Sequence, residues 1–178
     1  VEGDITNSGE IDASEGIYIE DSSTVDGSIT NAADATIIVG DDAIQLHNSA
    51  TVSGDITNAG VITAGENGIL VTYSSDVGGD IVNNGEITAE GIEVTSTTSA
   101  MVMGGVTNEP SEFEDDTGIG IFVNKSASVA GSILNNEGGE INAATDGILV
   151  SYTSTVGGDI INDGTITATE DDGIDITD

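Results

Sequence analysis

The chain has 178 residues, of which 33 are acidic, one is lysine, one is histidine and none is arginine, so its formal net charge is −32. Because neutralising phosphates requires lysine and arginine, this composition excludes nucleic-acid binding and attachment to anionic membrane surfaces. The absence of cysteine excludes disulfides and thiolate metal sites. High charge is typical of disordered chains, but 37% of the residues are apolar and recur periodically, which predicts one folded domain over residues 1–178.

A repeat that begins Val-x-Gly-x-Ile-x-Asn runs through the whole chain. Its units cover residues 1–24, 25–51, 52–76, 77–101, 102–128, 129–155 and 156–178. Within a unit, apolar and polar residues alternate over three short segments, a pattern typical of β-strands. In the third unit these segments are 52–58, 62–64 and 68–71. Such short strands are unstable alone, so each unit needs neighbours stacked above and below it.

This pattern predicts an all-β fold, a single-stranded parallel β-helix (β-solenoid) of about seven coils of 23–27 residues, with three short strands per coil. Each strand would pair with its counterpart one coil away, at a distance of about 4.8 Å. The core would consist of columns of valine and isoleucine, each buried side chain contributing about 1.5–3 kcal/mol. An antiparallel sandwich is the alternative fold, but it does not explain why one residue type recurs at the same phase in every unit.

One polar residue type recurs on the inner face of every unit. By strand parity, the asparagine six residues after the opening valine points inward with the valines and isoleucines. Stacked amides donate to and accept from the next coil, which satisfies their hydrogen bonds inside the core. We therefore expect a structural asparagine ladder of Asn7, Asn31, Asn58, Asn83, Asn108, Asn135 and Asn162.

The segment between the second and third strands carries acidic residues in every unit. They are Glu15, Asp41, Asp42, Glu66, Glu90, Asp115, Asp116, Asp146, Glu170, Asp171 and Asp172. Stacked in register, their charges repel one another, and a bound Ca²⁺ would relieve the repulsion through carboxylate oxygens. The alternative is a solvated acidic edge that keeps the rod soluble.

The fifth unit departs most from the repeat. Its segment 109–118, EPSEFEDDTG, is expected to protrude as a loop. Its carboxylates are the best candidates for a single metal site, with Ca²⁺ as the one cofactor considered. The predicted ligands are Glu112, Glu114, Asp115 and Asp116.

Catalysis is not expected. Polysaccharide lyases of acidic sugars need arginine or lysine to stabilise developing negative charge. The chain offers Lys125 and His47, which fall in units that are not adjacent. Acids are so abundant that two at the spacing of a glycosidase pair carry no information. We expect His47 to be a solvent-facing loop residue, and we predict that the chain is not an enzyme.

One outward-facing column of the third strand contains apolar residues. It consists of Tyr18, Gln45, Leu70, Glu93, Phe122, Leu149 and Asp175. Exposed apolar side chains in a row suit contact with a neighbouring fibre or a ligand. The column therefore predicts a contact strip, whereas scattered exposed apolar residues are also ordinary.

The phrase Gly-Asp-Ile-Thr-Asn-x-Gly-x-Ile-x-Ala, followed by Gly-Ile-x-Val, resembles the repeats of bacterial autotransporter passenger domains and filamentous surface adhesins. This resemblance implies a right-handed β-helix, secretion across the outer membrane, and an extracellular or cell-surface location. The function that it favours is a structural or adhesive β-solenoid of the cell surface or of a fibre. A module that binds a glycan or a surface protein is the alternative, and a polysaccharide-degrading enzyme is third.

Neither end of the chain shows an amphipathic helix or a polar capping segment. A solenoid needs caps to protect its open core, so we expect self-association, either end to end or as a section of a longer repeat array. No apolar run approaches the length of a membrane span, so no direct membrane insertion is expected in this segment. Any targeting signal or anchor is expected to lie outside these residues.

Overall fold

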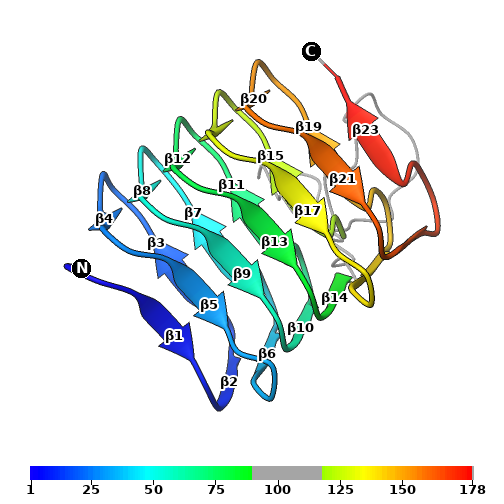
Figure 1. Ribbon diagram of the computed structural model, residues 1–178, viewed down its shortest axis with the longest axis horizontal. Helices are drawn as coiled ribbons and strands as arrows, with labels where there is room; N and C mark the ends of the chain where they lie inside the picture. The colour runs from blue at the N-terminus through cyan, green and yellow to red at the C-terminus, as the bar shows by residue number, and fades with distance from the viewer. Residues whose placement is uncertain (90–117, 178) are drawn as a thin grey trace, which may run out of the picture.

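The computed structural model describes residues 1–89 and 118–177, and the regular elements in these residues are all β-strands. The chain winds through six coils that stack along one axis (Figure 1). Coil 1 contains β1–β4, coil 2 β5–β8, coil 3 β9–β12, coil 4 β13–β16, coil 5 β17–β20 and coil 6 β21–β23. Corresponding strands form three six-stranded sheets and one five-stranded sheet.

The first sheet contains β1 (Ile5–Asn7), β5 (Ile29–Asn31), β9 (Ile56–Asn58), β13 (Ile81–Asn83), β17 (Ile133–Asn135) and β21 (Ile160–Asn162). The second contains β2 (Glu10–Ala13), β6 (Thr36–Val39), β10 (Val61–Ala64), β14 (Glu86–Ala89), β18 (Glu140–Ala143) and β22 (Thr165–Ala168). The third contains β3 (Ile17–Ile19), β7 (Ile44–Leu46), β11 (Ile69–Val71), β15 (Ile121–Val123), β19 (Ile148–Val150) and β23 (Ile174–Ile176). The fourth contains β4 (Thr24–Val25), β8 (Thr51–Val52), β12 (Asp76–Val77), β16 (Ser128–Val129) and β20 (Thr155–Val156).

Each strand pairs in parallel with its counterpart one coil away, and the same residue types meet. Ile56 pairs with Ile29 on one side and with Ile81 on the other. The other sheets repeat this register, so each column of isoleucine or valine runs continuously along the rod. The predicted all-β parallel β-solenoid is confirmed, with a fourth, two-residue strand in five of the coils in addition to the three expected.

The predicted number of coils, seven, is wrong. Strand β13 pairs directly with β17 and β14 with β18, although a whole predicted unit separates them in the sequence. Strand β15 comes from that unit and pairs with β11 and β19. The described strands of the predicted units 77–101 and 102–128, β13–β14 and β15–β16, therefore belong to one coil. Alternation indicates that a segment can form a strand, but only stacking decides which strand it pairs with.

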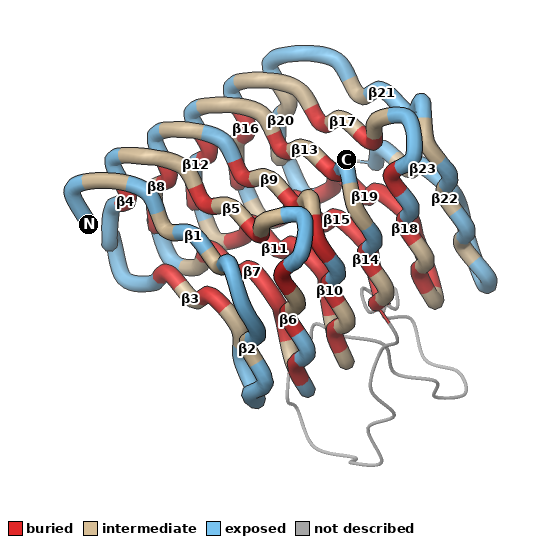
Figure 2. The backbone as a smooth tube through the Cα atoms, turned by 60° about the horizontal axis from the view of Figure 1, so that its bottom comes forward, coloured by how far each residue is buried: buried red, intermediate tan, exposed pale blue. Residues whose placement is uncertain are grey.

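The core is the inside of the rod, and its residues are most deeply buried in the middle coils (Figure 2). Ile56, Ile62 and Ile69, one from each large sheet of coil 3, have no exposed surface. In coil 6 the equivalent residues Ile160 and Ile166 are half-buried, and Ile174 is 41% exposed. Burial therefore comes from the coils on either side and not from the coil to which a residue belongs.

A glycine column shows how closely the coils approach. A Cβ added at Gly85, between β13 and β14, would meet the backbone carbonyls of Gly60 and Ala59 in the coil before it.

We expect Gly85→Ala to lower the free energy of unfolding by about 2 kcal/mol, because the two coils must move apart locally to make room for the added Cβ. Urea denaturation measures this loss of free energy. Gly9→Ala is the matched control, since Gly9 holds the same position in coil 1 and an added Cβ meets nothing within 4 Å. An equal loss in both variants would refute the steric explanation.

Side chains also connect the coils at the corner that precedes the first sheet. The Asp4 carboxylate accepts the Ser28 N–H, the Ser28 hydroxyl accepts the Asp55 N–H, and the Asp55 carboxylate accepts the Asp80 N–H, with distances of 2.8–3.0 Å. The Asp80 carboxylate and the next hydroxyl, at Ser132, continue this ladder toward coil 6. Some of the aspartates therefore stabilise the fold, because their carboxylates accept hydrogen bonds from backbone N–H groups of the neighbouring coil.

Candidate functional site

The inward asparagines form a hydrogen-bonded ladder along the described coils. The Nδ2–Oδ1 distances are 2.9 Å for Asn7–Asn31, Asn31–Asn58, Asn58–Asn83 and Asn83–Asn135, and 2.7 Å for Asn135–Asn162. Each donor amide also reaches a backbone carbonyl of the next coil, as Asn58 does at Glu86 (3.0 Å). The seventh predicted member, Asn108, lies outside the described residues. The four middle members, Asn31, Asn58, Asn83 and Asn135, are fully buried, so the ladder connects the coils from the inside of the rod.

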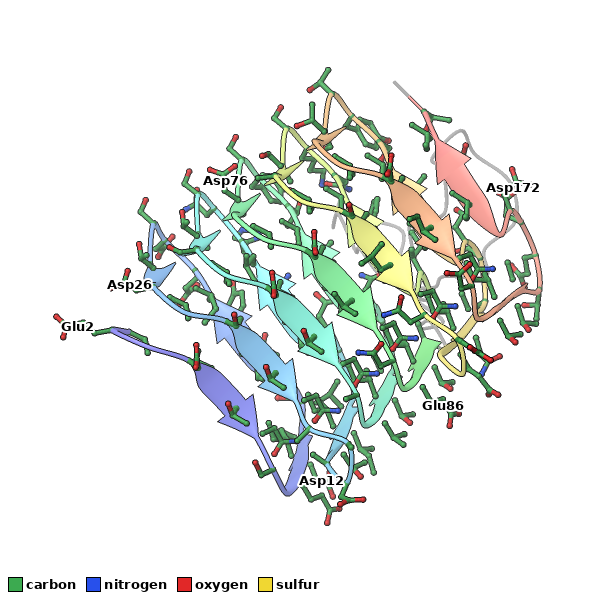
Figure 3. All side chains as sticks on the ribbon, viewed as in Figure 1. Glu2, Asp12, Asp26, Asp76, Glu86 and Asp172 are labelled. Carbon is green, nitrogen blue, oxygen red and sulfur yellow. The ribbon has the colours of Figure 1, made fainter. Side chains whose placement is uncertain are left out.

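The predicted metal ligands Glu112, Glu114, Asp115 and Asp116 also lie outside the described residues. Within residues 1–89 and 118–177, no group of three or more histidine, aspartate or glutamate side chains is placed to share a metal ion. Many exposed acids instead point away from the rod, as the labelled Glu2, Asp12, Asp26, Asp76, Glu86 and Asp172 do in Figure 3. Their mutual repulsion is spread over the surface and screened by solvent.

Three acids of the edge between the second and third sheets are less well solvated. Asp42 is buried, and its Oδ1 accepts the backbone N–H (3.1 Å) and the side-chain Nδ2 (2.9 Å) of Asn67. Burial nevertheless raises the pKa of Asp42 to about 6. Burial, and then the charges of Asp42 and Asp41, raise the pKa of Glu66 to about 8. The edge therefore takes up protons near neutral pH.

The same feature recurs in coil 5. Asp146 is buried, and its carboxylate accepts the backbone N–H of Asp172 at 3.1 Å. Burial raises its pKa to about 6, the hydrogen bond opposes this shift, and the nearby Asp171 and Asp175 charges add to it. Both buried aspartates thus satisfy a backbone donor of the next coil at an electrostatic cost.

A different set of side chains gathers where the third sheet turns toward the fourth. We call Tyr18, His47, Tyr73, Lys125 and Tyr152 the aromatic corner; it holds all three tyrosines, the one lysine and the one histidine of the chain. Tyr18 is in β3, and the other four follow β7, β11, β15 and β19. Five consecutive coils therefore each place one member of this set near the same edge of the rod.

Contacts inside the aromatic corner run from coil to coil. The ring centroids of Tyr18 and His47 are 6.4 Å apart, and those of His47 and Tyr73 are 4.6 Å apart. The Lys125 ammonium lies 4.5 Å from the Tyr73 ring centroid and donates to the Tyr73 hydroxyl at 3.1 Å. Tyr152 accepts the Ser126 N–H with its carbonyl, and its side chain is 45% exposed.

The sequence-based interpretation missed this cluster. His47 and Lys125 do lie in non-adjacent coils, but Tyr73 in the coil between them contacts both. His47 lies in the loop after β7, as expected, but it is half-buried between two tyrosines and not fully solvent-facing. One feature of the sequence points to the cluster: Tyr73, Lys125 and Tyr152 all stand two residues after the last apolar residue of the third strand.

The backbone at this corner is strained. At five successive turns, two consecutive non-glycine residues have positive φ: Asp21 and Ser22, Asn48 and Ser49, Tyr73 and Ser74, Lys125 and Ser126, Tyr152 and Thr153. Asparagine and aspartate tolerate this conformation, whereas large side chains are uncommon there. Coils 1 and 2 follow that preference, but Tyr73, Lys125 and Tyr152 have φ of 52°, 54° and 52°. Turn formation does not explain these three residues, and strain of this kind clusters at functional sites.

The predicted outward contact strip is largely buried. Leu70, Phe122 and Leu149 are at most 6% exposed, and with Ile119 they form an apolar cluster separate from the main core. The prediction that these three apolar residues are exposed is therefore wrong. Tyr18, Gln45 and Asp175 in the same column remain partly exposed, and Glu93 lies outside the described residues. Tyr18 belongs both to this column and to the aromatic corner, whereas Tyr152, which is 45% exposed, lies outside the column.

The described residues contain no helix with the length and apolarity needed to cross a membrane.

Residues 2–178 match the family model described as the BigA third pectate lyase-like domain. No curated protein and no solved structure gives a significant match.

Proposed function

Since the chain belongs to the family of the BigA third pectate lyase-like domain, we propose that it is an adhesive β-solenoid segment of a bacterial surface protein, located outside the cell. Its stacked coils would form a stiff rod, and the aromatic corner would be the part of the rod that contacts a ligand. The observation that carries the adhesive role is the strained placement of Tyr73, Lys125 and Tyr152 on successive coils.

The stacked coils support the structural part of the proposed function, which is to form a stiff rod. The asparagine ladder and the aspartate–serine ladder connect each coil to the next through side chains, in addition to the parallel backbone pairing. A stack that is hydrogen-bonded at both its sheets and its corners resists bending between coils. Such a rod suits a segment that holds a binding surface at a fixed distance from a cell.

We propose that the segment does not cleave polysaccharides. A pectate lyase-like fold does not specify a reaction, because function lies in the site and not in the fold. Stabilising the negative charge that develops beside a uronate requires cationic groups. The chain has one lysine, and its ammonium is placed on the ring and hydroxyl of Tyr73.

Attachment of beads to cells tests the adhesive role. Beads coated with the chain, and beads coated with the triple variant Tyr73→Asn, Lys125→Asn and Tyr152→Asn, are incubated with epithelial cell monolayers and with bacterial cells. Asparagine is the residue that coil 2 uses at this turn position, so the variant is expected to keep or increase its thermal stability. We expect attachment to at least one of the two cell types to fall about tenfold in the variant.

Equal attachment of the two kinds of beads would overturn the adhesive role, as would a lack of attachment to either cell type. Circular dichroism and thermal melting of both proteins serve as the control for folding. A variant that loses attachment while its melting temperature stays equal or rises has lost binding side chains and not structure.

A further inference from the structure

We propose that the aromatic corner binds a neutral glycan chain lying parallel to the axis of the rod, an inference that rests on the adhesive role proposed above. The corner repeats with the coils: Tyr73, Lys125 and Tyr152 occupy the same turn position in coils 3, 4 and 5. Since adjacent coils are about 4.8 Å apart, the backbone positions of the two tyrosines are separated by about 10 Å along the axis. This spacing suits a linear polymer that contacts one ring, then the lysine, then the other ring.

The chemistry of these groups fits sugar rings. Tyr152 is 45% exposed, and its ring offers an apolar face to the C–H face of a pyranose and a hydroxyl to its oxygens. Tyr73 is half-buried and contacts the His47 ring and the Lys125 ammonium, so it takes part together with Lys125 as one polar contact. The Lys125 ammonium adds hydrogen-bond donors for hydroxyl or amide oxygens. The corner therefore combines ring faces with polar groups.

The shape of the corner favours a polymer over a small molecule. Small ligands bind mainly in concave sites that enclose most of their surface. The aromatic corner instead follows a series of outward turns, where the residues after Tyr73 and Lys125, Ser74 and Ser126, are exposed and Tyr152 is 45% exposed. Affinity on such a surface must come from several weak contacts along one chain.

The charge of the protein selects for neutral sugars. With a net charge of −32, the rod repels anionic polysaccharides such as polygalacturonate, and Lys125 is the one lysine of the chain. A basic peptide would be attracted to the whole acidic surface, so its binding would not depend on three side chains of one corner. A neutral glycan avoids the repulsion and still uses every group of the corner.

Calorimetric titration of oligosaccharides tests this assignment. The probes are the hexamer and the dimer of β-1,4-linked N-acetylglucosamine, the hexamer of β-1,4-linked glucose, and hexagalacturonate. We expect at least one neutral hexamer to bind, and the dimer to bind about tenfold more weakly than a hexamer that spans both tyrosines. The single variants Tyr73→Asn and Tyr152→Asn are each expected to weaken hexamer binding about tenfold without lowering the melting temperature.

Three results would overturn the assignment: no binding of either neutral hexamer, neutral binding that the two variants leave unchanged, or tighter binding of hexagalacturonate than of the neutral hexamers. Hexalysine is the control for attraction to acidic surfaces. Its binding is expected to be equal in the wild type and the variants and to disappear at high salt, and loss of hexalysine binding in the asparagine variants would also count against a glycan site.

The two proposals fail separately. If beads attach to cells through the aromatic corner but no neutral oligosaccharide binds, the adhesive role stands and the ligand class is wrong. If neutral oligosaccharides bind at the corner but beads do not attach to cells, the glycan site stands and the adhesive role is wrong.

Discussion

Replacing Asn58 with alanine is expected to lower the free energy of unfolding by about 4 kcal/mol. The Asn58 amide accepts a hydrogen bond from Asn31 and donates to the Asn83 side chain and the Glu86 carbonyl, and all three amides of this part of the ladder are fully buried. Alanine leaves buried polar atoms without partners on both sides, and each of them costs about 1–3 kcal/mol. Urea denaturation followed by circular dichroism measures the loss.

The end of the ladder provides the matched control. Asn162 is exposed and takes part in one ladder bond, which it accepts from Asn135. Water replaces that bond, so Asn162→Ala is expected to cost less than about 1 kcal/mol. If both substitutions lower the free energy of unfolding by the same amount, the buried, mutually satisfied hydrogen bonds of the ladder are not the cause. The decrease would then reflect only the removal of an amide side chain.

The free energy of unfolding is expected to fall by about 3 kcal/mol as the pH rises from about 5 to about 9. Asp42, Glu66 and Asp146 have folded-state pKa values of about 6, 8 and 6, above the values of 3.8, 4.5 and 3.8 for free groups. A raised folded-state pKa means that the folded chain holds its proton more tightly than the unfolded chain. The stabilisation is therefore complete below about pH 4 and is lost as the pH rises through 6 to 8.

Glu66 is expected to account for the upper part of this pH window. Glu66→Gln keeps the shape but removes the charge, so it should raise the free energy of unfolding at pH 9 by about 2 kcal/mol, after allowance for screening by solvent, and leave it nearly unchanged at pH 4. Urea denaturation at a series of pH values measures both effects. Glu140→Gln is the control, because it removes the same charge from an exposed position and tests for general charge repulsion. Equal gains at pH 9 in both variants would show that burial of Glu66 is not the cause.

Local alternation was sufficient to predict the strands and their inner faces. Valine and isoleucine recur every second residue and at the same phase in each unit, and a parallel stack is the arrangement that buries all of them at once. The inward asparagines follow from the same parity, because a polar residue on a buried face must find its partners in the coils above and below. The strands, their inner faces and the inward asparagines can therefore be predicted from the residue pattern of a unit and its repetition.

Stacking decided what the repeat pattern left open. Residues 102–108 match the consensus as well as other units do, but β13 pairs with β17, so the number of coils and the neighbours of Lys125 depend on which strands actually meet. The aromatic corner arises in the same way: Tyr73 contacts His47 and Lys125 only because consecutive coils lie about 4.8 Å apart. The sequence by itself therefore determined the fold and the inner face of each coil, through a period that every unit repeats. The tertiary structure alone decided the coil count, the protonation of the edge at Glu66 and the composition of the outer corner, because these depend on contacts between residues far apart in the chain.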